Sequence, residues 1–334
     1  MFKKTKIVSI ILIVALFMTM LFTGCSSQDT STNTDKDSEK SSSWPEKIIE
    51  VIVPYGAGGD TDFNARTYTK YLEDVLGVTV VVSNMTGSSG SIATREVKGS
   101  EPNGYRVLLA NSALHVNEVS GITDFSWDEA FEIVAIGAKH SGDLLFVQGD
   151  APYETLEDLI KDSQKRPGEI TFGGDIGGTT HVIGGMLNKA GAEVTIVDQG
   201  GASGRLTGLK GGHVDIIPNP YGTMKDYVDL GDVKPLALLN DERNPHFSDI
   251  PTAIEQGHDV NMPKVYFFAM PKGTPQEIVD KLADALEEVS KMSEYQQDIE
   301  KAYYQQPFFL RGEEAARYMD EQRNMFMQFK DILR

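Results

Sequence analysis

The chain has 334 residues and carries 49 acidic against 31 basic side chains, which gives a formal net charge of −18. This balance excludes the basic face that nucleic-acid binding needs. It also opposes long-range attraction of anions, so an anionic ligand must be held by local groups. The single cysteine, Cys25, leaves no disulfide framework and no thiolate metal site.

Residues 1–25 have the pattern of an export signal. Three lysines among the first six residues precede an apolar run over 7–22, which is short for a stable span of a hydrocarbon core about 30 Å thick. Leu-Phe-Thr-Gly then precedes Cys25 and resembles a bacterial lipobox, although Phe stands where Leu is usual. We predict lipidation at Cys25 and a position outside the cytoplasm, anchored to the cell membrane. The alternatives are an ordinary membrane anchor or a secretory signal cut elsewhere.

A polar segment follows this signal. Residues 26–43 are only Ser, Thr, Asp, Lys, Gln, Asn and Glu, a composition that cannot bury apolar surface and predicts a disordered tether. Such a tether would reach roughly 25 Å. We assign residues 26–44 to the tether and expect the fold to start at about residue 45, with enough chain for one large or two medium domains.

Short β-rich runs alternate with helical stretches from this point to the C-terminus. Such alternation predicts an α/β fold with parallel sheets covered by helices. The predicted strands are 47–53, 78–82, 106–110, 133–137, 144–147, 169–172, 194–197, 214–217, 235–239 and 265–270. The predicted helices are 62–76, 91–98, 156–165, 179–189, 202–210, 224–230, about 275–291 and 313–332.

Glycine is concentrated in four loops, at residues 54–62, 84–91, 173–181 and 199–204, and each loop runs from a predicted strand into a predicted helix. Glycine lets a backbone turn tightly and approach a ligand closely. The following helix N-terminus offers unpaired N–H groups and a partial positive charge, which suit a carboxylate or a phosphate. Each loop alone could be no more than a tight turn, but four of them predict a shared ligand site at the strand ends.

Familiar catalytic and nucleotide-binding motifs are absent. A Rossmann fingerprint would need glycine where Thr61 stands, and no Walker A lysine follows a glycine-rich loop. There is no G-x-S-x-G nucleophile motif, and no two of the six histidines are three to five residues apart, as a helical metal pair requires. We therefore predict a protein that is not an enzyme and uses neither a cofactor nor a metal. A catalytic triad assembled only in space stays open as an alternative.

Seven segments, in order, resemble the extracytoplasmic solute-binding receptors of tripartite tricarboxylate transporters, the Bug family. The resemblance spans essentially the whole chain after the tether. The segments are an opening strand with Pro-Tyr, Gly-Gly and Asp (45–62), Asn-x-x-Gly-x-x-Gly (84–90), Pro-Asn-Gly-Tyr (102–105), a loop ending in Thr-His (173–181), Gly-Gly-x-Val-Asp (211–215), Ile-Pro-Thr (250–252) and Pro-x-Gly-Thr-Pro (271–275).

The resemblance implies a two-domain periplasmic-binding-protein type II fold, of the Venus flytrap kind, with the ligand in the interdomain cleft. Domain 1 would comprise residues 45–146 and 265–334, and domain 2 residues 147–264. The implied function is capture of a small carboxylate (a di- or tricarboxylate or an amino-carboxylate) and its delivery to membrane permease subunits by a monomeric receptor. A sensor that signals to a membrane partner is the alternative, followed by an enzyme on the same scaffold.

The resemblance also implies which residues bind the ligand, because in the family backbone groups of the first and third loops hold a carboxylate with bridging waters. We expect His181 and Asp62 to face the ligand, although each could instead stabilise its own helix start. Arg66 and Arg205 are the nearest cations in sequence, and we interpret both as surface or structural residues. The expected ligand-binding residues are Tyr55, Gly58, Gly59, Asp62, Gly87, Ser88, Asn111, Ser112, Asp175, Gly178, Thr179, His181 and Asn219.

One loop departs from the family pattern. Where the family usually has Pro-Tyr-Lys-Gly-Ser, residues 198–202 read Asp-Gln-Gly-Gly-Ala, so an aromatic and a lysine are missing and an acid is added. Asp175 and Asp198 could therefore pair with an amine, which would make the ligand an amino-carboxylate. The alternative is that both are exposed loop acids.

Overall fold

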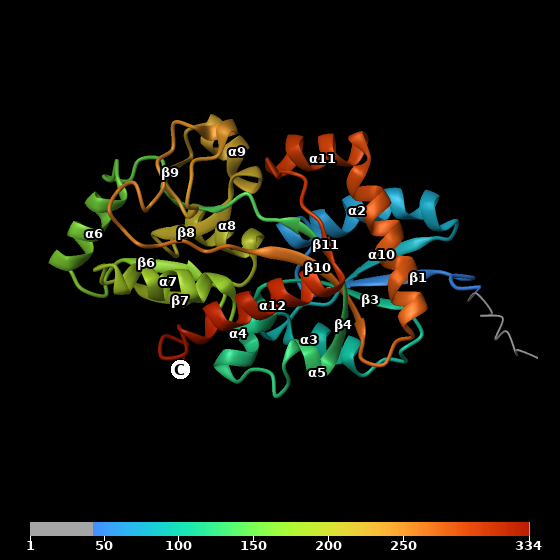
Figure 1. Cartoon of the computed structure of the whole chain (residues 1–334). Helices are drawn as coiled ribbons and strands as arrows, with labels where there is room; N and C mark the ends of the chain where they lie inside the picture. Colours follow the sequence, from blue (N-terminus) through green and yellow to red (C-terminus); the bar gives the residue numbers. More distant parts are fainter. Residues whose placement is uncertain (1–42, 334) are drawn as a thin grey trace, which may run out of the picture. The chain divides into compact units, whose positions relative to one another are not determined.

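The computed structural model describes residues 43–333. The predicted signal, Cys25 and the tether as far as residue 42 lie outside that range. Ser42–Arg334 forms one compact unit that contains two sheets, and we call each sheet with its covering helices lobe 1 and lobe 2 (Figure 1). Within residues 43–333, no helix is both long and apolar enough to span a bilayer.

Lobe 1 is a six-stranded sheet of order β11-β4-β10-β3-β1-β2. Its strands are β1 (Ile49–Val53), β2 (Val80–Asn84), β3 (Arg106–Asn111), β4 (Phe131–Lys139), β10 (Val265–Pro271) and β11 (Leu310–Arg311). Its helices are α2 (Asp60–Leu76), α3 (Ser91–Lys98), α4 (Ala113–Ser120), α5 (Trp127–Ala130), α10 (Gln276–Lys291), α11 (Ser293–Tyr303) and α12 (Gly312–Met327), with a 3-10 turn at Ser88–Gly90.

Both faces of the lobe 1 sheet are covered, which explains its apolar strands. Along β10, Tyr266 and Phe268 pack in a cluster with α2, α10 and α11, whereas Phe267 and Ala269 pack on the other face with α3 and α12. This alternation follows from the two-residue period of a strand. The first helix ends as expected, because Gly77 takes the left-handed conformation (φ 68°) and its N–H donates to Glu73 O.

Lobe 2 is a five-stranded sheet of order β7-β6-β8-β5-β9. Its strands are β5 (Asp143–Gln148), β6 (Thr171–Gly174), β7 (Thr195–Asp198), β8 (Ile216–Pro220) and β9 (Val233–Leu238). Its helices are α6 (Leu156–Lys165), α7 (Thr179–Lys189), α8 (Ala202–Lys210) and α9 (Tyr221–Asp229), with a 3-10 turn at Pro245–Phe247. Its two apolar clusters lie on opposite faces of the sheet, one with α6 and α7 and the other with α8 and α9.

The chain crosses from lobe 1 to lobe 2 after β4 and returns before β10, and these two crossings correct the expectation of parallel sheets. The pairs β1–β2, β1–β3, β6–β7 and β6–β8 are parallel, but β10 runs antiparallel to β3 and β4, and β5 runs antiparallel to β8 and β9. Both antiparallel strands begin where the chain has just crossed from the other lobe, so they enter their sheets in the opposite direction.

The places where the chain crosses differ slightly from the expected domain limits. β4 ends at Lys139 in lobe 1 and β5 starts at Asp143 in lobe 2, a few residues before the expected limit at 146. The return crossing ends at Val265, where β10 begins. After α12, the chain runs back to lobe 2 (Figure 1), and Phe326 and Leu333 pack in a lobe 2 cluster.

All ten predicted strands are present, and their ends differ from the predicted ends by no more than three residues. The helices α4, α5 and α11 and the two-residue strand β11 were not predicted. α4 and α11 were missed because each begins directly after another element, without an intervening loop that would mark its start. The four glycine-rich loops all connect a strand to a helix, as predicted.

Candidate functional site

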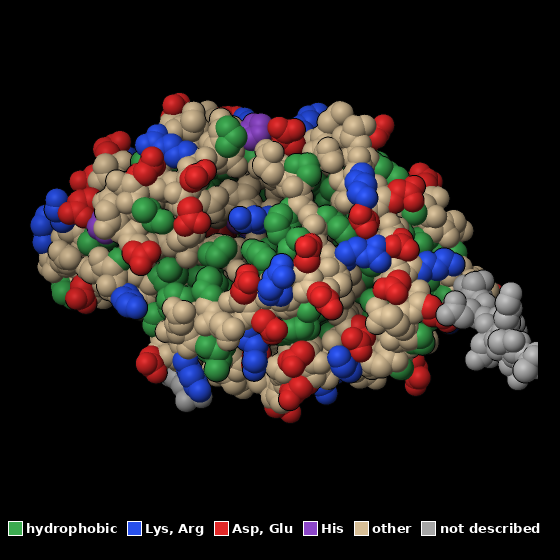
Figure 2. Space-filling view, in the orientation of Figure 1, with side chains coloured by type: hydrophobic (Ala, Val, Ile, Leu, Met, Phe, Trp, Pro, Cys, Tyr) green, Lys and Arg blue, Asp and Glu red, His purple; other side chains and the backbone are tan. Residues whose placement is uncertain are grey.

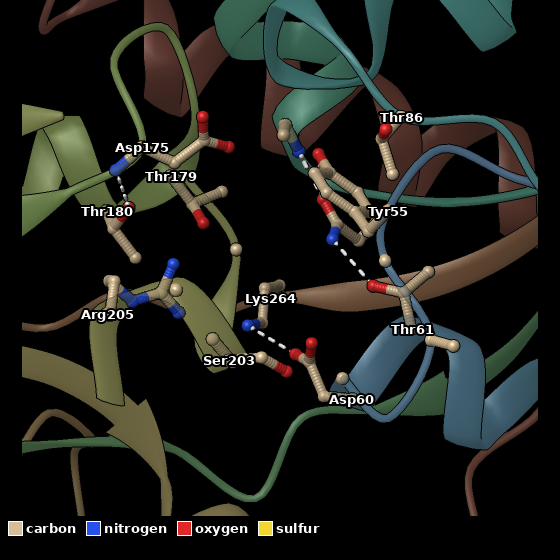
Figure 3. A pocket seen from close by; sticks show the side chains of 18 residues that line it. Tyr55, Asp60, Thr61, Thr86, Asp175, Thr179, Thr180, Ser203, Arg205 and Lys264 are labelled. Atoms are coloured by element: carbon tan, nitrogen blue, oxygen red, sulfur yellow. Dashed lines mark hydrogen bonds and ion pairs between the residues drawn. The ribbon is translucent and has the colours of Figure 1, made fainter. Parts of the chain in front are cut away.

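A cavity of about 240 Å³ lies between the lobes. The first turns of four helices form part of its wall, α2 and α4 from lobe 1 and α7 and α8 from lobe 2 (Figure 3). The N–H groups of a first helical turn have no partner within their helix. The lining residues are Tyr55, Gly56, Ala57, Gly59, Asp60, Thr61, Thr86, Asn111, Ala113, Asp175, Thr179, Thr180, Gly201, Ala202, Ser203, Gly204, Arg205 and Lys264.

The lobe 1 wall is held together by one amide side chain. Asn111 Nδ2 donates to Thr61 Oγ1 at 3.0 Å, and Asn111 Oδ1 accepts from the backbone N–H of Ala113 at 2.9 Å. The Tyr55 hydroxyl lies 3.5 Å from the same oxygen. Asn111 therefore ties the first turn of α2 to the first turn of α4, so that both helix starts keep a fixed position at the cavity.

Buried charges that the sequence analysis did not predict form the cavity floor. Lys264, 4% exposed, lies 2.8 Å from Asp60 Oδ2 and 3.6 Å from Asp143 Oδ2, and the Tyr266 hydroxyl donates to Asp60 Oδ2 at 2.5 Å. Burial favours the neutral form of Asp60, but the charge and hydrogen bond of Lys264 and the hydrogen bond of Tyr266 outweigh it and hold the pKa of Asp60 well below its usual range.

His140 is neutral in this cluster. Burial, and then the charge of Lys264, lowers the pKa of His140 to about 4, and its Nδ1 accepts from the backbone N–H of Gly142 at 3.0 Å. Burial disfavours the charge of Lys264, yet Asp143 and Asp60 raise its pKa above the usual value. Lys264 is therefore a cation that compensates the acids of the floor.

The lobe 2 wall combines helix starts with one arginine. Arg205, in the first turn of α8, is 5% exposed. Its Nε donates to Pro218 O and to Asn219 Oδ1, both at 2.9 Å, and its Nη1 donates to Gly200 O at 2.8 Å. Arg205 was interpreted as a surface or structural residue; it is not on the surface, since its side chain is buried and hydrogen-bonded, and it also faces the cavity (Figure 3).

A contact between the lobes lies beside the cavity. Ser89 Oγ of lobe 1 lies 2.6 Å from Asp175 Oδ1 and 2.7 Å from Ile176 O of lobe 2. Ser88 and Ser89 have positive φ angles of 46° and 50°, which are uncommon for serine and are often found at functional sites. The backbone carbonyl of Ser89 accepts from Asn117 Nδ2 at 3.0 Å, so the left-handed turn is fixed from lobe 1.

Five of the residues expected from the sequence line the cavity, and the others lie outside its lining. The five are Tyr55, Gly59, Asn111, Asp175 and Thr179. Gly58, Gly87 and Gly178 shape the loops, and a side chain at Gly178 would meet Asp175 Oδ2 at 2.6 Å. Ser88 is exposed and lies outside the lining.

Four polar residues of the expected set have structural partners instead. Asp62 accepts from Arg66 Nε and from the N–H of Gly58, both at 3.0 Å. Ser112 Oγ accepts from the N–H of Val265 at 3.0 Å. His181 Nδ1 accepts from the N–H of Gly177 at 3.3 Å, and Asn219 orients Arg205.

The predicted amine partner Asp198 is also displaced from the cavity. Asp198 is exposed, and its Oδ1 accepts from the backbone N–H groups of Gly200 at 3.2 Å and Ile176 at 3.4 Å. It is not a lining residue, because its side chain instead supports the turn that leads into α8. The described part of the chain contains no group of three or more His, Cys, Asp or Glu side chains that could hold a metal ion.

The face of the molecule drawn in Figure 2 carries charges of both signs. Acidic and basic side chains are interspersed over the face drawn in Figure 2, with no basic patch on it. On this face no excess of basic side chains would attract an anion, in agreement with the acidic net charge of the chain.

Comparison with known proteins gives a consistent assignment. Residues 64–329 match the family described as "Tripartite tricarboxylate transporter family receptor" (TctC). BugT of Bordetella pertussis is 28% identical over 241 residues, which cover 71% of this chain and 74% of BugT.

Solved structures show the same fold. The periplasmic binding protein BugD superposes with a TM-score of 0.78 at 26% identity and covers 86% of this chain and 98% of BugD. MatC of Rhodopseudomonas palustris, solved with bound malate, has a TM-score of 0.78 at 23% identity and covers 87% and 100% of the two chains. The family match, the two-lobed fold and the cavity between the lobes agree, and the chain belongs to the TctC family of tripartite tricarboxylate transporter receptors, which are solute-binding proteins.

Proposed function

We propose that this protein is an extracytoplasmic, lipid-anchored receptor that captures a small carboxylate between its lobes and delivers it to a tripartite tricarboxylate-type membrane transporter. One observation carries the proposal: helices from both lobes begin at the wall of a single cavity. Their N–H groups and dipoles favour an anion without any excess of surface basic charge. Family membership supports the transporter partner, and the segment before Cys25 supports the anchor.

The placement of the cavity suggests capture by closure. Residues of both lobes line it, and the chain connects the lobes at crossings near residues 140–142 and 263–264 and again after α12, where the C-terminal residues pack on lobe 2. Two lobes joined in this way can rotate about the connections, and a ligand that contacts both favours the closed arrangement. The cavity volume is below the roughly 300–1,000 Å³ of drug-sized ligand sites, so the ligand is a small molecule.

The test is binding of malate, succinate, citrate and adipate to the chain from residue 26 onward, followed by thermal unfolding and calorimetry. A ligand at 100 times its Kd stabilises the folded state by about 2.7 kcal/mol, which raises Tm by about 4–5 °C for a unit of this size. We expect at least one of these carboxylates to bind. If none of them binds, the proposed function is wrong.

A blocking variant places this binding in the cavity. Ser203 lines the cavity in the first turn of α8, so Ser203→Trp should abolish binding by filling the site. Thr207 lies one turn further along the same helix and is exposed, so Thr207→Trp is the matched control and should bind normally. Equal binding by both variants would show that the ligand binds elsewhere.

A further inference from the structure

Arg205 is a buried cation without an anionic partner. It is 5% exposed, and no carboxylate within residues 43–333 forms an ion pair with its guanidinium within 4.0 Å. By contrast, Lys264, the other Lys or Arg residue of the cavity lining, forms an ion pair with Asp60. A buried charge is costly unless it is paired, and leaving one unpaired in a folded protein points to a partner that is absent from the chain itself.

The guanidinium is held in one orientation. Pro218 O, Asn219 Oδ1 and Gly200 O accept from Nε and Nη1, whereas Nη2 makes no hydrogen bond within the described chain. Figure 3 shows the end of the side chain directed into the cavity between Thr180 and Lys264. Because the side chain is already ordered, a ligand that binds Nη2 loses little conformational entropy from the arginine.

The first turn of α8 adds further donors beside Arg205. Ala202, Ser203 and Gly204 line the cavity and lie in the turn whose N–H groups lack helical partners. A planar carboxylate can accept from a guanidinium and from backbone N–H groups together. This end of the cavity therefore has the chemistry of a carboxylate site of its own.

The opposite end of the cavity favours a second carboxylate over an amine. Asp60 is compensated by Lys264 and Tyr266, and the start of α2 supplies N–H donors there. The one other acid in the lining, Asp175, already contacts Ser89 at 2.6 Å, and burial raises its pKa. An ammonium group would therefore have to displace Lys264 from Asp60 or Ser89 from Asp175.

We propose that Arg205 is the specificity-determining residue of this receptor and that it binds a second carboxylate, so that the ligand is a short dicarboxylate spanning the two lobes. One carboxylate lies against Arg205 and the first turn of α8, and the other lies against the first turns of α2 and α4 beside Thr61 and Asn111. This inference rests on the proposed function, and it replaces the amino-carboxylate hypothesis drawn from Asp175 and Asp198.

Three four-carbon probes test the inference by calorimetry on the chain from residue 26 onward. Succinate presents a carboxylate at the far end, butyrate a methyl group, and 4-aminobutyrate an ammonium group. Wild-type protein should bind succinate at least about 100-fold more tightly than either of the others, since the loss of a buried charged partner is worth about two or more powers of ten in affinity. Preference for 4-aminobutyrate or butyrate would overturn the inference.

Variants then assign this preference to Arg205. Arg205→Gln should weaken succinate binding by about 30-fold or more and leave butyrate binding nearly unchanged. The affinity of Arg205→Lys for succinate should lie between those of wild type and Arg205→Gln, because the lysine ammonium group is a point charge without the planar donor geometry of a guanidinium. Arg317→Gln removes an exposed arginine of α12, 69% exposed at its side chain, and serves as the control with wild-type affinity.

The outcomes separate this inference from the proposed function. If wild type and Arg205→Gln bind succinate equally, Arg205 is not the determinant, although the protein is still a carboxylate receptor. If wild type binds none of the carboxylates, the proposed function itself fails. Thermal unfolding checks the fold of each variant, and if Arg205→Gln does not fold, the succinate preference of wild type and of Arg205→Lys decides the question.

Discussion

Removal of the Ser89 hydroxyl should weaken ligand binding although Ser89 is not in the cavity lining. Its Oγ is the atom of lobe 1 that contacts Asp175 Oδ1 at 2.6 Å and Ile176 O at 2.7 Å in lobe 2. These contacts exist only while the lobes are together. Ser89→Ala should therefore destabilise the closed arrangement and leave the open one unaffected.

The magnitude follows from the two contacts. A net hydrogen bond is worth about 0.5–1.5 kcal/mol, and a buried acceptor left unsatisfied costs about 1–3 kcal/mol. We expect Ser89→Ala to reduce the free energy that favours the closed arrangement by about 2 kcal/mol, which corresponds to a Kd about 30-fold higher. Kd rises by the whole 30-fold if the ligand-free protein is mainly open, because the substitution then destabilises only the ligand-bound, closed form.

The assay is calorimetry at pH 7 with a carboxylate that the wild-type protein binds. Ser88→Ala is the matched control, since Ser88 is the exposed neighbour in the same left-handed turn and its hydroxyl makes no hydrogen bond within the described chain. Small-angle scattering should show a smaller radius of gyration on ligand addition for wild type, and a higher ligand concentration should be needed for Ser89→Ala. A Kd for Ser89→Ala within twofold of wild type would refute the reasoning.

Two further predictions concern ionisation. Asp175 lies partly buried at the contact between the lobes, which opening would expose, and burial, opposed by Ser89 and Arg205, raises its pKa. The closed form thus binds a proton more tightly than the open form, and ligand affinity should fall as pH rises above about 4. Asp175→Asn should show no such fall when the two Kd values are compared from pH 4 to 8; a parallel pH dependence would contradict this. Lys264→Met leaves the acids of the floor uncompensated and should lower the free energy of unfolding by about 3–5 kcal/mol, or Tm by about 5–8 °C. Lys225→Met removes a cation of an exposed pair and should cost less than about 1 kcal/mol. Equal losses for the two variants would show that the buried pair is unimportant.

The hydrogen-bond geometry of the interlobe contact agrees with the pH prediction. The Ser89 hydroxyl has one proton but faces two acceptors, Asp175 Oδ1 and Ile176 O. If Asp175 is protonated, it donates to Ser89, which donates to Ile176 O, and both contacts are satisfied. The charged groups that face Asp175 are Arg205, which lowers its pKa, and Asp198, which raises it.

Local sequence patterns predicted the strands and the glycine-rich loops because both depend on nearby residues. Strand period, glycine and helix-start residues are local properties, and the ends of parallel strands gather at one edge of a sheet whatever the rest of the fold does. The loop at 54–62 thus brings Tyr55 and Gly59 to the cavity. Asp62 was expected there as well, but Asp60 lines the site instead. The two positions differ by about 200° around a helix, and sequence alone does not fix that rotation.

The charged floor and the arginine could not be read from sequence because they depend on distant contacts. Asp60 meets Lys264, a residue 204 positions later, only because β10 returns from lobe 2 into the lobe 1 sheet. In the sequence, Arg205 resembles a surface residue of a helix. Only the fold brings Pro218 O and Asn219 Oδ1 to accept its hydrogen bonds. The antiparallel direction of β5 and β10 is likewise set by the crossings. It could not be predicted, because the apolar sequence of a strand does not indicate in which direction the strand runs.

The most direct test of the central claim is a crystal structure of the chain from residue 26 onward grown with succinate. The account predicts succinate in the cavity, with one carboxylate within hydrogen-bond distance of Arg205 Nη2, the other at the first turns of α2 and α4, and Ser89 in contact with Asp175. Succinate bound outside the cavity, or in the cavity with Arg205 contacting no ligand oxygen, would contradict it.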